Sequence, residues 1–124
     1  MVSETRHEIP VYMNPDLAVD VRVADLVSRM TLEEKVSQMV HGAPAVRRLG
    51  IPAYNWWNEC LHGVGRAGIA TVFPQAIGMA AAWNVDLLHR VAVAISDEAR
   101  AKHHAALNAD GDAEQYYGLT FWTP

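Results

Sequence analysis

The sequence is poor in features that would place it at once in several broad classes. It contains one cysteine, Cys60, which excludes an internal disulfide and agrees with a reducing compartment. No apolar run approaches the roughly 18 to 20 residues that a membrane span needs, and the longest, over 77–83, contains a glycine. Ten lysines and arginines stand against fourteen acidic residues and form no basic run. We therefore expect neither a membrane nor a nucleic acid as partner.

A secretory signal is also missing from the first ten residues. They mix acidic, basic and polar side chains, without the apolar centre and the small-residue cleavage site of a signal peptide. We expect a cytoplasmic protein, and secretion by another route stays open.

Patterns for metal binding are incomplete. His103 and His104 are adjacent, so on a helix they point about 100° apart, which suits ligation of one ion badly. Asp110 and Asp112 flank Gly111, but the loop lacks the ligand ladder of a calcium site. We expect no metal.

Two further patterns lack the context that their chemistry requires. The stretch 63–68 reads Gly-Val-Gly-Arg-Ala-Gly, but a β-branched segment closed by Pro74 follows where a dinucleotide-binding loop needs a helix. Cys60 has His62 two residues away but no third group to orient the pair, and we interpret it as a packed thiol. No cofactor is expected, although a dinucleotide enzyme stays open as a third hypothesis.

What the sequence does contain is the composition and patterning of a folded domain, with 51% hydrophobic and 19% charged residues. Apolar residues at helical spacing predict a helix that begins near Asp16 or Asp20 and ends at Met30. A Thr-Leu-Glu-Glu capping box at Thr31 predicts a second helix, which should continue toward the Gly42–Pro44 stop signals. A long helix is predicted over 85–106, and Asn84 should cap it.

The remaining segments are predicted as strands, loops and core. Strands are predicted over 54–58 and 118–122 and loops over 63–68 and 108–115, whereas the small apolar segment 73–83 is expected in the core without a clear type.

The most informative stretch joins two indoles, an amide and a carboxylate: Trp56, Trp57, Asn58 and Glu59. Indole faces can cover the apolar C–H side of a pyranose, and a carboxylate accepts hydrogen bonds from hydroxyls worth roughly 1.5 to 3 kcal/mol each. The alternative is a buried aromatic strand, since tryptophan is buried on average. A carboxylate is seldom buried without a partner, which favours a sugar site at the C-terminal end of the predicted strand.

Several motifs occur in an order that resembles glycoside hydrolase family 3. They lie at 30–35, 49–52, 54–64, 73–78, 82–84, 96–102 and 118–124, and together they extend over nearly all the chain after the first 15 residues. Within the family the pattern is most similar to β-xylosidases, whose first barrel strand ends in a Trp-Asn-Glu motif. β-Glucosidases usually show an Asp-Gly-Pro type of sequence there.

The resemblance implies a substrate-binding role for Glu59, Trp57 and Asn58. Glu59 would bind hydroxyls of the sugar in the innermost subsite, with Trp57 close by. Glutamate is one methylene longer than aspartate and could fill the space of a glucose hydroxymethyl group, a difference worth about 1 to 3 kcal/mol. The implied activity of the longer protein is retaining hydrolysis of terminal β-D-xylosyl residues of xylo-oligosaccharides. A β-glucosidase of the same family and a non-catalytic protein-interaction module from a truncated gene stay open.

The family's catalytic residues have no match on this chain. Neither the aspartate nucleophile nor the acid/base motif is present, and Lys102-His103 lies too early to be the family's lysine-histidine pair. Retaining chemistry needs two carboxyls about 5 to 5.5 Å apart. Asp110, Asp112 and Glu114 are the available partners for Glu59, but no motif supports them, so no catalytic residue is expected on this chain.

The implied fold is α/β, the N-terminal half of a (β/α)8 (TIM-like) barrel. A complete barrel takes about 250 residues, and this chain has 124. We expect an N-terminal tail over 1–15 and a partial barrel domain over 16–124. Half a barrel leaves strand edges and an apolar face uncovered. Besides a carbohydrate substrate, the expected partners are the missing C-terminal part of the enzyme or a second copy, and the chain alone should be inactive.

Overall fold

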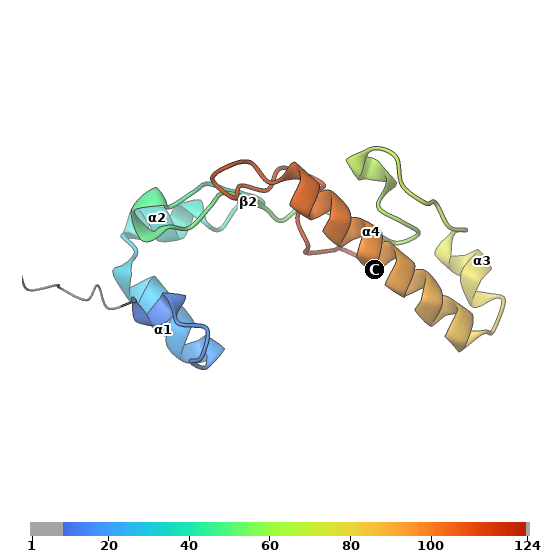
Figure 1. Cartoon of the computed structure of the whole chain (residues 1–124), viewed down its shortest axis with the longest axis horizontal. Helices are drawn as coiled ribbons and strands as arrows, with labels where there is room; N and C mark the ends of the chain where they lie inside the picture. The colour runs from blue at the N-terminus through green and yellow to red at the C-terminus, as the bar shows by residue number, and fades with distance from the viewer. Residues whose placement is uncertain (1–8, 124) are drawn as a thin grey trace, which may run out of the picture. The chain divides into compact units, whose positions relative to one another are not determined.

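The computed structural model describes residues 9–123, and the chain divides between Val36 and Ser37 into two compact units. The elements that follow are labelled in Figure 1, where α4 is the longest helix. Of the predicted N-terminal tail, residues 1–8 lie outside the described residues. No helix among the described residues is long and apolar enough to cross a membrane.

The first unit contains the 3-10 turn η1 (Val11–Met13) and the helix α1 (Val19–Arg29). Tyr12 in η1 is buried, and its backbone N–H donates to Asp25 in α1 at 3.0 Å. The Nε–H of Arg22 donates to the Tyr12 carbonyl at 3.1 Å. Asp25 also pairs with Arg29 at 2.9 Å within α1. The turn η1 is therefore joined to α1 by the Asp25 carboxylate and the Arg22 guanidinium.

The helix boundaries follow the predicted signals closely at the start of each helix. The capping box is confirmed: Thr31 N–H donates to the Glu34 carboxylate at 2.9 Å, and Glu34 N–H donates to the Thr31 hydroxyl at 3.2 Å. However, α2 (Leu32–Ser37) ends before Gly42, so the predicted length is wrong. Val36, Met39 and Val40 are all exposed, and burial of an apolar face supplies most of a helix's stability.

The second unit begins with a short antiparallel pair, β1 (Gly42–Ala43) and β2 (Tyr54–Asn55). Ala113 lies on the other side of β2: its carbonyl accepts from Asn55 N–H at 2.9 Å, and Tyr54 and Ala113 form a parallel bridge. The predicted strand over 54–58 is therefore confirmed only for its first two residues.

The predicted strand over 118–122 is wrong, because these residues form no strand. They lie beside residues 54–58 and are joined to them by backbone–backbone hydrogen bonds and by hydrogen bonds between backbone and side chains. The Trp122 N–H donates to the Asn58 carbonyl at 2.9 Å, whereas the Leu119 N–H donates to the Tyr54 hydroxyl at 2.7 Å. A β-branched and aromatic sequence predicts a ladder of backbone–backbone hydrogen bonds. Here hydrogen bonds to side chains take the place of that ladder.

The helix α4 (Val85–Ala106) has the predicted bounds, and the Asn84 side chain caps it by accepting from Leu87 N–H at 2.9 Å. Its residues Ile95 and Ala99 form a buried cluster with Val64. Cys60, Ala70, Phe73, Val91, Leu119 and Phe121 pack against this cluster and are partly buried. This cluster fixes the segment 60–73 onto the helix.

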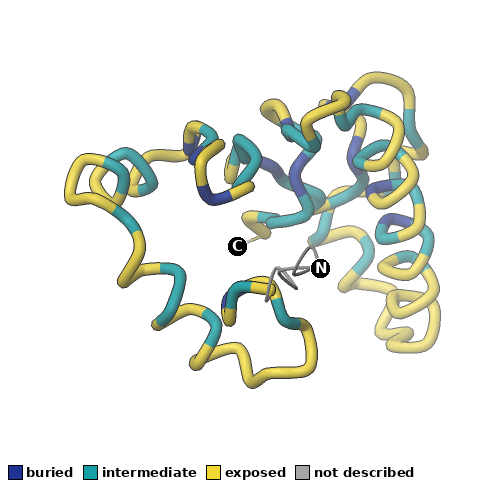
Figure 2. Tube along the Cα trace, turned by 60° about the vertical axis from the view of Figure 1, so that its left-hand side comes forward, coloured by how far each residue is buried: buried dark blue, intermediate teal, exposed yellow. Residues whose placement is uncertain are grey.

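The segment 73–83 contains a short helix, α3 (Ala76–Ala80). Phe73 contributes to the core, but Ile77 and Trp83 are 83% and 93% exposed, so the expectation of a core segment is wrong for them. An apolar segment is buried only where another part of the protein covers it, and its own composition does not provide that cover. Figure 2 shows how little of the trace is buried over the described residues.

The described residues combine helices with two short strands. The finer expectation, half of a (β/α)8 barrel, stays a prediction at this point.

Candidate functional site

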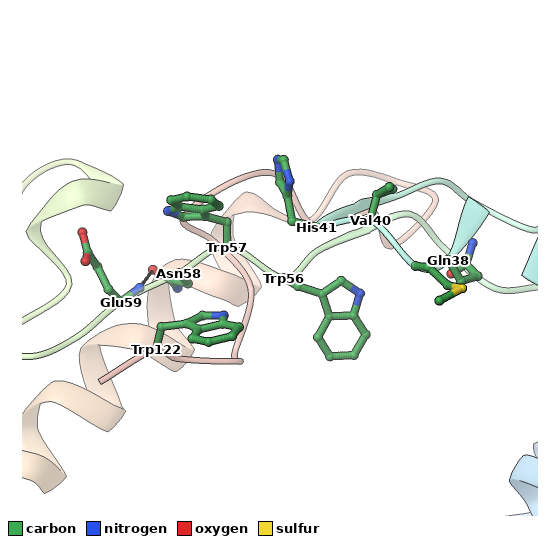
Figure 3. A pocket seen from close by; sticks show the side chains of 9 residues that line it. Gln38, Val40, His41, Trp56, Trp57, Asn58, Glu59 and Trp122 are labelled. Atoms are coloured by element: carbon green, nitrogen blue, oxygen red, sulfur yellow. Dashed lines mark hydrogen bonds between the residues drawn. The ribbon is translucent and has the colours of Figure 1, made fainter. Parts of the chain in front are cut away.

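An open pocket of about 630 Å³ lies in the second unit, within the size range of small-molecule sites. It brings together the three predicted site residues, Trp57, Asn58 and Glu59 (Figure 3). The rest of its lining comes from Gln38, Met39, Val40, His41, Trp56 and Trp122.

Backbone bonds on both sides hold the stretch 56–58 in place as the chain leaves β2. On one side, Trp56 N–H donates to the His41 carbonyl at 2.7 Å. On the other, the Trp57 carbonyl accepts from Tyr116 N–H at 3.1 Å. The extended stretch is therefore held between two segments that are distant in sequence.

The indoles of the pocket are open to solvent, since Trp56, Trp57 and Trp122 are 46%, 51% and 72% exposed. Trp57 contacts the His41 ring edge-on, with centroids 5.5 Å apart, whereas Trp56 contacts the Tyr54 ring at 4.7 Å. Figure 3 shows the indoles spread along the pocket, with the Glu59 carboxylate beyond Trp57. Exposed aromatic faces beside a carboxylate suit a ligand with both apolar and hydroxyl surfaces.

Asn58 is the buried member of the predicted site, at 4% exposure. Its amide donates to the Gly118 carbonyl at 2.7 Å, and its side-chain oxygen accepts from Glu59 N–H at 2.9 Å. Both ends of the amide are thus engaged with backbone. This geometry gives Asn58 the task of joining the segment 118–122 to the pocket wall and orienting the backbone of Glu59.

Glu59 forms an ion pair with Arg66, whose Nε contacts the carboxylate oxygen Oε1. Arg66 in turn donates through Nη1 to the Tyr116 hydroxyl at 3.2 Å, and its guanidinium lies 5.5 Å from the centroid of that ring. The Tyr116 hydroxyl and the Glu59 charge together raise the pKa of Arg66. A carboxylate has about four acceptor positions, so one ion pair does not saturate it.

The loop that carries Arg66 is fastened to α4. Lys102 Nζ donates to the Ala67 carbonyl at 2.8 Å. The Glu98 carboxylate accepts from Thr71 N–H at 3.0 Å and from its hydroxyl at 2.5 Å, and these bonds lower the pKa of Glu98. Arg66 therefore belongs to an anchored loop.

This anchored loop is also the Gly-Val-Gly-Arg-Ala-Gly stretch. It forms the three-residue turn η3 (Gly65–Ala67), and residues 68–75 are not helical. The helix N-terminus that a dinucleotide site needs is thus absent from this described segment. Cys60 packs against the core, where burial raises the pKa of its thiol, so the interpretation as a packed thiol is confirmed.

Two of the histidines considered as ligands or as a base, His62 and His103, lie beside backbone carbonyls. His62 Nδ1 lies 3.0 Å from the Phe73 oxygen, and His103 Nδ1 lies 2.7 Å from the Tyr117 oxygen. Each ring thereby connects two segments of the second unit.

Asp112, one of the carboxylates considered as a partner for Glu59, is engaged elsewhere. It accepts from Ala53 N–H at 2.6 Å and from the Asn108 amide at 3.0 Å, and it pairs with Arg47 at 2.5 Å. The Arg47 bond, then those from Asn108 and Ala53, lower the pKa of Asp112 from 3.8 to about 2. Asp112 thus fastens the loop after α4 to the start of β2.

We expect Asp112→Asn to lower the thermal unfolding midpoint of the 124-residue chain at pH 7. Because the pKa of Asp112 is depressed in the folded chain, its charged form stabilises the fold above about pH 4 and loses this effect as the pH falls toward 2. The difference in midpoint between variant and parent should therefore disappear near pH 2, as followed by circular dichroism. Asp110→Asn is the matched control, because Asp110 is 68% exposed and lies 3.6 Å from Arg47. A difference that persists at pH 2 would contradict this assignment.

The site residues that the sequence did not predict include His41, Arg66, Tyr116 and Trp122. Trp122 was assigned to a strand, Arg66 to a loop and Tyr116 to no motif at all. The available signals were an aromatic residue near each predicted strand end and an arginine in a glycine-rich loop. Neither pattern says which carboxylate or ring the side chain will meet.

The chain is similar in sequence to one family of known proteins. The sequence profile described as "Glycosyl hydrolase family 3 N terminal domain" matches residues 13–106. The chain is 43% identical over 114 residues to the xylan 1,4-β-xylosidase of Xylanibacter ruminicola, covering 91% of this chain and 13% of that protein. It is 43% identical over 123 residues to β-xylosidase/α-L-arabinofuranosidase 2 of Medicago sativa subsp. varia, covering 91% and 15%. A probable exo-1,4-β-xylosidase of Aspergillus fumigatus is 43% identical over 119 residues, covering 87% and 14%. The chain thus spans 13–15% of the length of these relatives.

Proposed function

Because this chain belongs to the glycosyl hydrolase family 3 N-terminal domains, we propose that it supplies sugar-binding residues to a retaining β-glycosidase acting on terminal β-D-xylosyl residues of xylo-oligosaccharides. The observation that carries the proposal is the exposed indole of Trp57 beside the Glu59 carboxylate in one open pocket. The family resemblance seen in the sequence is confirmed, and the names of the matched relatives support xylose as the sugar.

Each proposed site residue has a physical task. Glu59 accepts hydrogen bonds from hydroxyls of the innermost sugar, and its length leaves no room for a hydroxymethyl group. Trp57 covers the apolar side of the ring with its half-exposed indole. Asn58, whose amide bonds Gly118 and the Glu59 backbone, sets the position of the carboxylate.

The nucleophile and the acid/base residue are proposed to come from polypeptide outside this chain. The barrel would likewise be completed by that polypeptide, which would cover the exposed apolar residues of α3 and α4. The apolar side chains available for this contact include Ile77, Val85 and Leu88, which are 83%, 80% and 43% exposed. A second copy of the chain is the alternative cover.

We expect the purified 124-residue chain to show no turnover of 4-nitrophenyl β-D-xyloside. Retaining chemistry uses two carboxyls about 5 to 5.5 Å apart, whereas Glu59 is paired with Arg66 and no motif of the catalytic carboxyls is recognised on this chain. The release of nitrophenol is the measurement, with the Xylanibacter ruminicola enzyme as the positive control. Turnover that purifies with this chain would contradict the assignment of the catalytic pair to another segment.

The sugar preference is tested in a chimera in which this chain replaces the matching segment of the Xylanibacter ruminicola enzyme. We expect Glu59→Asp to shift the ratio of kcat/KM for xyloside over glucoside roughly 10- to 200-fold toward glucoside, because one methylene of space is opened in the subsite. An unchanged ratio would remove Glu59 from this role. A parent chimera that already prefers glucoside would instead favour a β-glucosidase.

A further inference from the structure

The Glu59 carboxylate is held from outside the pocket, by Arg66, which does not line it. Their side chains are 43% and 60% exposed. A solvent-exposed ion pair orients its partners weakly, because water screens it and two long side chains must be ordered. A stable orientation of Glu59 therefore needs a second group that restrains Arg66.

Tyr116 is that second group, and it restrains Arg66 in two ways. Its hydroxyl accepts from Arg66 Nη1 at 3.2 Å, and its ring lies 5.5 Å below the guanidinium carbon. A guanidinium that both lies over an aromatic ring and donates a hydrogen bond to its hydroxyl is restrained from rotating away from the carboxylate.

The backbone of Tyr116 is itself unusual, with φ at +70°, a conformation that bulky residues rarely adopt. In this conformation its N–H donates to the Trp57 carbonyl at 3.1 Å. Strained residues persist where the surroundings hold them, and they cluster at functional sites. One residue thus contacts the backbone of Trp57 and, through Arg66, the carboxylate of Glu59.

We propose that Tyr116 is a positioning residue of the sugar site: its ring and hydroxyl hold Arg66 against Glu59, while its backbone N–H holds Trp57. This inference rests on the proposed sugar-binding function of the pocket. The backbone of the Arg66 loop is anchored independently, because Lys102 bonds the Ala67 carbonyl at 2.8 Å. Removal of the Tyr116 hydroxyl should therefore loosen the Arg66 side chain, which keeps only the ring contact, and leave the loop in place.

The test is a double-mutant cycle in the chimera between Tyr116→Phe and Arg66→Met, read as kcat/KM and KM for 4-nitrophenyl β-D-xyloside. Tyr116→Phe keeps the ring and removes the acceptor, and we expect about a 3- to 10-fold loss of kcat/KM. In the Arg66→Met background the same substitution should cost less than 2-fold, because Tyr116 acts through Arg66. Arg66→Lys provides a second cycle if Arg66→Met reduces the soluble yield.

Tyr117→Phe is the matched control, since the Tyr117 hydroxyl makes only a 3.5 Å bond to the Ala67 carbonyl. It should change kcat/KM less than 2-fold. Equal losses from Tyr116→Phe in both backgrounds, or no loss in either, would overturn the inference. Failure of the proposed sugar-binding function would give a different result, because Glu59→Ala would then leave kcat/KM unchanged.

Discussion

Glu59→Ala in the chimera is expected to lower kcat/KM for 4-nitrophenyl β-D-xyloside by about two to four orders of magnitude. A carboxylate that accepts two hydroxyl hydrogen bonds contributes roughly 3 to 6 kcal/mol, at 1.5 to 3 kcal/mol for each charged bond. Steady-state kinetics with xyloside and glucoside provide the measurement. The loss should fall on both sugars, which distinguishes it from the change in preference expected for Glu59→Asp.

The fold should survive this substitution. Glu59 is 43% exposed on its side chain, and the solvent-exposed pair with Arg66 contributes little stability. Glu114→Ala is the matched control, because Glu114 is also exposed and was considered as a second carboxyl. We expect the control to leave kcat/KM unchanged. A comparable loss in Glu114→Ala would place the essential carboxylate elsewhere, whereas parental activity in Glu59→Ala would refute the sugar-binding role.

The second large effect is expected at Gly63. Its φ is +126°, and a Cβ built there would lie 2.3 Å from the Thr71 carbonyl oxygen and 3.6 Å from the Val72 Cα. Both contacts are with backbone, so no flexible side chain can move aside. Strained backbone costs about 1 to 3 kcal/mol and overpacking about as much again. We expect Gly63→Ala to destabilise the second unit by about 3 kcal/mol or more.

The consequence at the site follows from the neighbours of Gly63. The adjacent Val64 is 2% exposed and forms the core cluster with α4. A shift of the backbone here would move the loop that carries Arg66. We therefore expect a lower thermal midpoint, a lower soluble yield and reduced kcat/KM in the chimera.

Gly65→Ala is the control for this prediction, two residues further along the same loop. A Cβ there would lie 3.6 Å from a Val72 methyl group, which is ordinary van der Waals contact. We expect its midpoint to stay close to that of the parent. If the two variants unfold at the same temperature, the close approach of Gly63 to Thr71 does not limit the fold.

Local signals predicted the helices well because the groups that define them are close in sequence. The Asn84 cap and the bounds of α4 were both predicted, as was the reciprocal bonding of Thr31 and Glu34. Each rests on side chains within one turn of the backbone they satisfy. The length of α2 was not predictable in this way, because it depends on whether an apolar face finds a surface to cover.

The strands were predicted less well because pairing is a property of two segments. Residues 118–122 have the composition of a strand, yet the Tyr54 hydroxyl accepts from Leu119 N–H and the Asn58 amide donates to the Gly118 carbonyl. A Cβ on Gly118 would lie 2.6 Å from the Asn55 carbonyl oxygen. This close approach depends on partners more than 60 positions away in sequence, which no local pattern contains.

The sequence by itself determined the family and the principal helices, and it predicted Trp57, Asn58 and Glu59 as sugar-binding residues, because each of these signals lies in residues that are neighbours along the chain. Only the tertiary structure decided that the Asn58 amide bonds backbone and that Trp122 lines the pocket. It also decided that Arg66 pairs with Glu59 and bonds the Tyr116 hydroxyl. The physical reason is distance along the chain. A carboxylate's partner can come from any segment that packing brings within reach, and packing is settled by the whole unit.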